Sequence, residues 1–524
     1  MTGAIALVLV AIVLGAIISI GQTLRARKEL QRALVAEGKA VASEVQAQAE
    51  KANAQAALHF LQDDVLNQAS PAYQPDRDIK LRAVLDSIAE RLELDAGRPP
   101  LVVASIRQTL GSVYTELGEV TKAVLHYERA FEIQRHRLGE HDLETMRSLH
   151  GLAIAYWLRG DLPKADPLTR QGLEQSRAVL GEKHPLTLQF MQARAMTLLY
   201  TAAIPWTDLE PLFLQALALH REVFGPDDLR TLRLSSWLSV GYNLNWQPAK
   251  AEPLTVDSLE RARRVIGDKH PEIANLTLVM GYIYANLNQP RKAEPLAHAS
   301  VEAHRGILGE ENFSTMLAVI LLARVYVQQQ KFDQAQPLTE QVINLSRRLP
   351  IKDHPVMPWK LSLLSGEYLE QGQVAQAATL SELALEALRQ KPNPQANAYV
   401  ITQMAEVRLA QQKYGEAESL LRESSPLLEK QWPEAAYLFH VMSLLGGSLS
   451  GQQKYNEAEP LLLQGFQGLQ QRQQASTPAY LSPRRRIGES LERLVQLYDA
   501  WGKPSQAAEW RQKLKQFNEA KTQL

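Results

Sequence analysis

The chain has 524 residues, more than one compact hydrophobic core usually supports, and it contains no cysteine, which excludes disulfides, thiol catalysis and thiolate metal sites. Basic and acidic residues balance at 57 each, so no net charge draws the protein to nucleic acid. Aromatic residues make up only 6%, so we expect a core built mostly from Leu, Ala, Val and Ile.

Residues 1–22 are predicted to form a transmembrane anchor. Residues 3–21 carry no charge, and at about 1.5 Å per residue a helix of this length measures roughly 28 Å, close to the thickness of a bilayer core. A cleaved signal peptide is the alternative, because Ser19-Ile20-Gly21 fits a cleavage site, but the apolar run is long and no basic residue precedes it. The positive-inside tendency would place the C-terminal part in the cytoplasm, because basic residues follow the span at Arg25, Arg27, Lys28 and Arg32.

Residues 23–58 are rich in Ala, Glu, Gln, Lys and Arg and contain no proline, which predicts a juxtamembrane helix. Leu24, Leu30 and Leu34 suggest a seam, so a coiled-coil homodimer and a solvated spacer helix both remain open. Residues 59–100 are predicted to be a helical segment that precedes the repeats.

A repeated pattern dominates the chain from about residue 105 onwards. One tyrosine recurs at intervals of 42 or 44 residues, at Tyr114, Tyr156, Tyr200, Tyr242, Tyr284, Tyr326 and Tyr368, and again at Tyr498. Nine residues later stand Ala123, Ala165, Leu209, Ala251, Ala293, Ala335, Ala377 and Ala507. Sixteen residues further on, a glycine recurs as Gly139, Gly181, Gly225, Gly267 and Gly309. Three markers in fixed phase indicate an array of similar structural units.

Each repeat is predicted to form a helical hairpin. The tyrosine lies near the end of the first helix, and the alanine in the second helix lets the two helices approach closely. A positive backbone φ is expected at the turn between them, where Gly118, Gly160, Asn288, Gly372 and Gly502 stand. An N-cap role is predicted for the residues that open the first helices, namely Asp142, Asp228, Asn312, His184, His270 and His354.

Stacking of such hairpins buries a continuous core. We therefore expect an all-α fold, a right-handed superhelical solenoid of about ten helix-turn-helix repeats. Regular 42-residue repeats cover residues 101–390, and less regular repeats with a capping helix cover residues 391–524, where the tyrosine is lost twice.

Three local features depart from the plain repeat. Two extra residues before Tyr200 predict a bulge in the third unit. A proline two residues after the alanine position, as at Pro167, is predicted to bend or restart the second helix. The Gln-rich residues 464–477, followed by the basic triplet Arg484–Arg486, are predicted to form a long connection, and the triplet is too short for a nucleic-acid site.

The repeat resembles the tetratricopeptide family. The likeness rests on Leu149, Gly151, Tyr156, Gly160 and Ala165, and on Ala251-Glu252-Pro253-Leu254. The 42-residue period resembles the subtype found in kinesin light chains, which implies binding of proteins or peptides and no cofactor. That subtype carries an Asn pair on the concave face. The matching positions here hold other residues, and the candidate partner-binding residues are His150, Ser236, Trp237, Leu278, Ile320 and Ser362. The alternative is that several of them belong to the core between repeats.

A second resemblance covers residues 60–93, which together with the apolar span are similar to the C-terminal half of certain bacterial serine/threonine kinases. In those proteins the repeats lie outside the cytoplasm, which opposes the orientation given by the basic residues. No kinase motif is found in the chain.

The sequence offers no catalytic or metal-ligand constellation. His136, His141 and His150 are close in sequence but do not share a helical face, and no H-E-x-x-H motif is found. We therefore expect a non-enzymatic scaffold, tethered to a bacterial inner or plasma membrane, that binds proteins or peptides and not nucleic acid. The alternative is the sensory half of a kinase-type signalling system.

Overall fold

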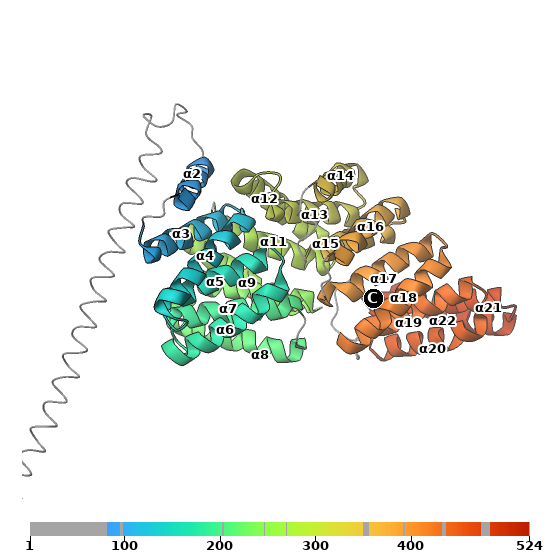
Figure 1. Cartoon of the computed structure of the whole chain (residues 1–524). Coiled ribbons are helices and arrows are strands. Elements are labelled where there is room, and N and C mark those ends of the chain that lie inside the picture. The colour runs from blue at the N-terminus through green and yellow to red at the C-terminus, as the bar shows by residue number, and fades with distance from the viewer. Residues whose placement is uncertain are drawn as a thin grey trace, which may run out of the picture.

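The computed structural model describes residues 81–94, 98–201, 204–245, 247–268, 270–348, 356–390, 394–431, 436–472 and 483–522. Every regular element within these ranges is an α-helix, as predicted (Figure 1). The predicted anchor at 1–22 and the juxtamembrane helix at 23–58 lie outside the described residues. Among the helices that are described, none is long and apolar enough to cross a bilayer.

Ten helical hairpins follow a single helix, α2 (Leu81–Leu94), and this number agrees with the prediction. The first helices of the hairpins are α3 (Pro100–Glu116), α5 (Leu143–Leu158), α7 (Pro185–Thr201), α9 (Leu229–Leu244), α11 (Pro271–Asn286), α13 (Phe313–Gln328), α15 (Met357–Glu370), α17 (Pro394–Ala410), α19 (Ala436–Gly451) and α21 (Pro483–Ala500). The second helices are α4 (Val120–Leu138), α6 (Leu162–Leu180), α8 (Trp206–Phe224), α10 (Pro248–Ile266), α12 (Pro290–Leu308), α14 (Phe332–Arg348), α16 (Val374–Gln390), α18 (Tyr414–Gln431), α20 (Tyr455–Gln471) and α22 (Pro504–Thr522).

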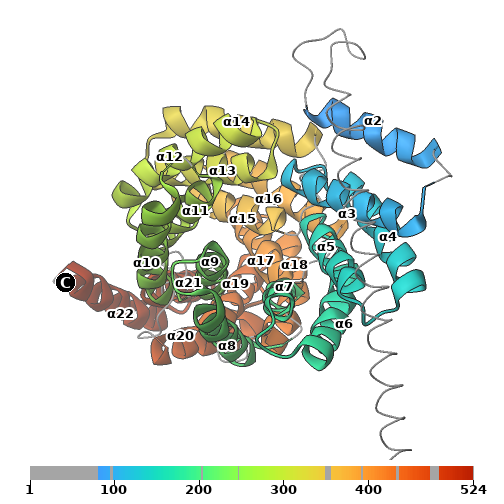
Figure 2. The same ribbon diagram turned by 90° about the vertical axis from the view of Figure 1, so that its left-hand side faces the viewer.

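The hairpins wind into a coil with the first helices inside and the second helices outside (Figure 2). Each first helix contacts the first helix of the next hairpin. Contacts also join hairpins that are five apart, because α7 touches α17 and the Asn312 side chain lies against Gly118. One turn of the coil therefore takes about five hairpins, and successive turns touch.

The repeat tyrosine joins its hairpin to the preceding second helix. Tyr242 donates a hydrogen bond of 2.8 Å to Glu210, and the Lys250 ammonium lies 5.3 Å from the centroid of the same ring. Burial, then the hydrogen bond to Glu210, raises the pKa of Tyr242 to about 12. Comparable hydroxyl contacts are Tyr114 to Asp86, Tyr156 to Glu128, Tyr326 to His298, Tyr368 to Thr339 and Tyr498 to Glu459, while Tyr284 lies beneath Lys292.

The repeat alanines lie where the two helices of a hairpin cross. Six of them have no exposed surface, namely Ala123, Ala165, Ala251, Ala293, Ala335 and Ala377. A methyl group at this point allows the close helix approach that the sequence pattern predicts.

The third hairpin differs from the prediction. No bulge interrupts α7, which is a continuous α-helix of 17 residues. Two extra residues turn a helix by about 200°, so Tyr200 faces the inside of the coil instead of the preceding second helix. Its ring packs edge-on against Trp157, at 5.6 Å between centroids, and against Trp237, at 6.3 Å. Because of the insertion, Tyr200 does not contact the preceding second helix as the other repeat tyrosines do, and instead belongs to an aromatic cluster with Trp157 and Trp237.

The turns within the hairpins confirm the expected positive φ angles. Gly118 has a φ of 76° and Asn288 a φ of 55°. Glutamines occupy the same place in three other hairpins, and the sequence pattern did not reveal them: Gln330, Gln412 and Gln453 have φ angles of 59°, 59° and 64°. The backbone geometry of the turn is thus kept without glycine.

The helix starts also follow the prediction. The carboxylate of Asp142 accepts a hydrogen bond of 2.9 Å from the amide of Glu144, and His270 Nδ1 accepts one of 3.1 Å from the amide of Glu272. His354 lies outside the described residues.

Two other local expectations differ from the structure in part. The second helices are not restarted at their prolines, because α6 runs without a break through Pro167, which removes one backbone N–H donor. The Gln-rich segment is helical up to Gln471, at the end of α20, and residues 473–482 lie outside the described ranges.

Replacing Gly181 by alanine is expected to destabilise the protein by about 1–2 kcal/mol. Gly181 ends α6 with a φ of 84° and a ψ of 169°, a region that only glycine adopts freely, and no atom lies within 4 Å of an added Cβ. The cost is therefore one of backbone strain alone. The measurement is the denaturant midpoint followed by circular dichroism. Gly306→Ala is the control, because this helical glycine also has open space around it, and its replacement is expected to be neutral or stabilising.

Candidate functional site

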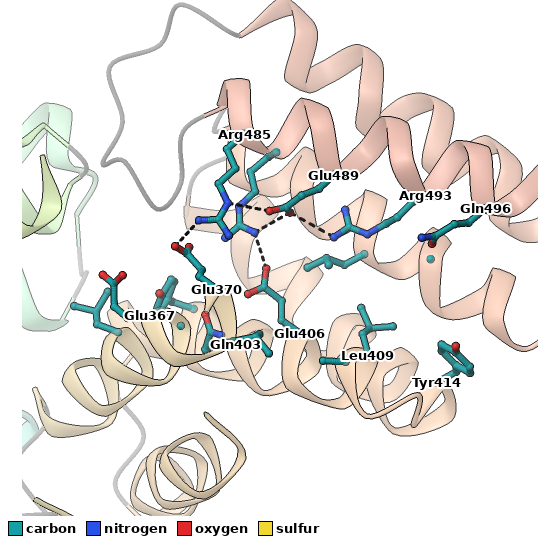
Figure 3. A pocket seen from close by; sticks show the side chains of 18 residues that line it. Glu367, Glu370, Gln403, Glu406, Leu409, Tyr414, Arg485, Glu489, Arg493 and Gln496 are labelled. Atoms are coloured by element: carbon teal, nitrogen blue, oxygen red, sulfur yellow. Dashed lines mark hydrogen bonds and ion pairs between the residues drawn. The ribbon is translucent and has the colours of Figure 1, made fainter. Parts of the chain in front are cut away.

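The inner face of the last four hairpins encloses a cavity of about 440 Å³ (Figure 3). Side chains from the first helices α15, α17, α19 and α21 line it, together with Tyr414 at the start of α18. Leu409, Tyr414 and Gln496 lie toward one end, and the carboxylates Glu367 and Glu370 lie with Arg485 toward the other end, which we call the charged end (Figure 3). We call this cavity the inner pocket.

Ion pairs cross the inner pocket from α21 to α15 and α17. Arg485 forms an ion pair with Glu370 of α15, and Arg486 lies 3.2 Å from Glu406 of α17. Glu489, one turn further along α21, lies 3.1 Å from Arg485 and 2.9 Å from Arg486. The first turn of the last hairpin is therefore held electrostatically against helices two and three hairpins earlier.

Burial and neighbouring charges shift the pKa values of these carboxylates in opposite directions. Burial, reinforced by the charge of Glu367, raises the pKa of Glu370 to about 7 even though Arg485 opposes the change. Burial also disfavours the ionised form of Glu489, but Arg486 and the other guanidinium groups outweigh it and hold the pKa of Glu489 below its ordinary value. Glu370 is thus the carboxylate whose charge is least compensated.

Two further polar side chains lie beside these charged groups: His440 contacts Glu406, and Gln403 lines the inner pocket. His440 Nε2 lies 2.6 Å from Glu406, and burial followed by the charge of Arg486 lowers the pKa of His440 to about 4, so this imidazole is neutral. Gln403 is only 2% exposed and its Nε2 makes no hydrogen bond to the described residues. The Gln403 amide lies between the α15 carboxylates and Glu406 (Figure 3).

A buried polar chain leads into the inner pocket along the first helices. Asn286 donates to Asn243 at 2.8 Å, and Arg324 donates to Asn286 at 3.2 Å and to Glu367 at 2.7 Å. The Arg324 side chain is 0% exposed and that of Glu367 is 5% exposed. Gln328 donates a further hydrogen bond of 2.8 Å to Glu367. This chain links α9, α11, α13 and α15.

Most of the six candidate residues from the sequence lie within the packing between hairpins. Ile320 and Ser362 have no exposed surface, while Ser236 and Leu278 are each 8% exposed. His150 stacks edge-on against Phe190, and Trp237 against Trp157. A partner therefore cannot touch Ile320 or Ser362 in this conformation.

The sequence pattern did not identify the inner pocket. Its ion pairs join residues of the seventh, eighth and tenth hairpins, and no repeat marker places these residues together. The sequence does contain one sign of these ion pairs. Arginines stand at the start of the last unit, and glutamates stand near the C-terminal ends of the first helices α15 and α17. In the part of the chain that is described, no group of acidic or histidine side chains is arranged to hold a metal ion.

The hairpin array defines a helical-repeat protein. A family model described as tetratricopeptide repeat matches residues 102–178, which cover the first two hairpins almost completely, so the predicted tetratricopeptide repeats are confirmed there. No curated protein matches the chain.

Several solved structures are similar to the chain. A Podospora anserina putative kinesin light chain with nearly identical TPR-like repeats shares 22% identity, over 39% of this chain and 95% of that chain, with a TM-score of 0.32. BtubC (BKLC) from P. vanneervenii shares 16% identity, over 44% and 91%, with a TM-score of 0.36. A Rap protein complexed with competence and sporulation factor shares 13%, over 72% and 98%, with a TM-score of 0.47.

Proposed function

We propose that the chain is a scaffold that binds protein partners on the inside of its coil, at the inner pocket, and that residues 3–21 tether it to a membrane. The observation that supports this proposal is a partly open cavity lined by four consecutive first helices of a tetratricopeptide-type array. Glu370 and Glu406 in the inner pocket are paired with Arg485 and Arg486, and Gln403 offers an amide that donates hydrogen bonds without transferring protons. This chemistry suits binding rather than catalysis.

Site-specific photocrosslinking in cells tests the proposal. A photoreactive amino acid is placed at Ala410 or Gln496, which are exposed at the rim of the inner pocket, and as a control at Glu302, which is exposed on the second helix α12. We expect the same partner protein to be crosslinked from both rim positions and not from Glu302. Equal crosslinking from all three positions, or none from the rim, would refute binding at the inner pocket.

The kinase-related role is a second candidate. It is favoured by the resemblance of residues 60–93 to a segment of bacterial receptor kinases, and it requires the repeats to face away from the cytoplasm. Protease accessibility on intact cells tests this second candidate, because protection of the repeats from a protease added outside would remove it, whereas their digestion is compatible with both candidates.

A further inference from the structure

The ion pair between Arg485 and Glu370 closes the charged end of the inner pocket. It joins the tenth hairpin to the seventh, across two intervening hairpins. The side chains remain partly accessible, at 38% exposure for Arg485 and 19% for Glu370. An ion pair at this exposure exchanges with competing ions, because water screens it and solvates both partners once it opens.

The carboxylates at this end attract a cation. Glu367 and Glu370 stand one turn apart on α15 and both line the inner pocket. Glu367 is already bonded to Arg324, which is completely buried, so Arg485 supplies the exchangeable cation for Glu370. A guanidinium or ammonium group brought by another chain would meet the same carboxylate.

A second observation points to a polypeptide ligand. The Gln403 side chain is 98% buried and lines the inner pocket beside these carboxylates, yet its Nε2 has no hydrogen-bond acceptor among the described residues. A buried amide donor without an acceptor destabilises the fold, and a peptide carbonyl that accepts its hydrogen bond would remove this cost. A basic residue in an extended segment provides both the cation and the carbonyl.

We propose that the inner pocket binds a basic segment of a protein partner, with an arginine or lysine side chain on Glu370 and a backbone carbonyl on Gln403, and that Arg485 holds the place of this side chain in the free protein. Arg485, at the start of α21, thereby acts as an internal competitor. This inference rests on the proposed function, because it specifies the partner chemistry of the same pocket. An internal competitor lowers the apparent affinity for a partner by the fraction of molecules in which the pocket is closed.

The test uses the full chain, purified from membranes in detergent, and a fluorescent synthetic peptide with the sequence of residues 482–488, Ser-Pro-Arg-Arg-Arg-Ile-Gly. Fluorescence anisotropy at low salt reports binding. We expect the Arg485→Ala variant to bind the peptide about tenfold more tightly than the natural chain. Adding Glu370→Gln to this variant should abolish the gain, and a peptide with citrulline in place of each arginine should not bind.

Arg511→Ala is the matched control. It removes the same charge from an exposed ion pair with Asp499 in the last hairpin, outside the inner pocket, and should leave peptide binding unchanged. Thermal unfolding confirms that each variant is folded, and Arg485→Gln supplies the same measurement if Arg485→Ala is unfolded.

Equal affinity of the natural chain and the Arg485 variants would overturn the proposal, as would tight binding of the citrulline peptide. A concentration-dependent dimer of the Arg485 variant that excludes the peptide would also overturn it, because the ligand would then be a second copy. Crosslinking of a partner from the pocket rim that persists while the basic peptide fails would reject this inference alone. Loss of the crosslinks themselves would reject the proposed function.

Discussion

Replacing Arg324 by alanine is expected to destabilise the protein by about 3–5 kcal/mol, because the change leaves the buried carboxylate of Glu367 without its cationic partner. Arg324 is completely buried and bonds to both Asn286 and Glu367. Without the guanidinium group, the carboxylate of Glu367 keeps one hydrogen bond among the described residues, the one that Gln328 donates. The midpoint of denaturant-induced unfolding, followed by circular dichroism, measures the loss.

Two comparison variants separate the charge effect from a general loss of packing. Arg511→Ala removes an exposed arginine and is expected to change stability by less than about 0.5 kcal/mol. The double variant Arg324→Met, Glu367→Leu removes both charges and should recover at least half of the loss, because an apolar pair of similar volume replaces a buried ion pair at little cost. A double variant no more stable than Arg324→Ala would show that volume, and not charge, dominates at this site.

Replacing Gly172 by alanine is expected to cost about 3 kcal/mol through overpacking. An added Cβ would lie 2.0 Å from Cε1 and 2.4 Å from Cζ of Phe190, whose ring has no exposed surface. Phe190 also packs edge-on against His150, so the ring has little room to move. Thermal and denaturant midpoints report the change.

A smaller partner should relieve the strain at Gly172. Phe190→Leu in the Gly172→Ala background is expected to be more stable than Gly172→Ala alone, even though the same substitution destabilises the natural chain. Gly415→Ala is the matched control, because this exposed helical glycine has no atom within 4 Å of an added Cβ. A Gly172→Ala variant as stable as Gly415→Ala would contradict the close contact with Phe190.

The repeat markers were sufficient to predict the hairpins, because each marker reports a local feature of one unit or a contact between adjacent units. A recurrent alanine indicates where two helices cross, and a glycine such as Gly118 indicates a positive φ. The same logic failed at Gln412, since a glutamine that adopts the left-handed conformation leaves no compositional sign. It also failed at Tyr200, where a two-residue insertion preserved the tyrosine but turned it to the opposite side of its helix.

The inner pocket could not be predicted for a different reason. The pitch of the coil is the sum of small rotations between successive hairpins, and side-chain identity within one repeat does not determine it. Whether Arg485 meets Glu370 depends on three such rotations. From the sequence alone, the glutamates of α15 and α17 could not be distinguished from charged residues on a solvated surface. The basic triplet was for the same reason assigned to a connection.

The contact between α7 and α17 alters the mechanics of the coil. In an open solenoid each unit touches only its neighbours, so the chain extends like a spring and can unfold from an end one unit at a time. Here a force along the axis must first separate the third hairpin from the eighth. The two turns consequently behave as a short cylinder that resists extension until this contact is broken.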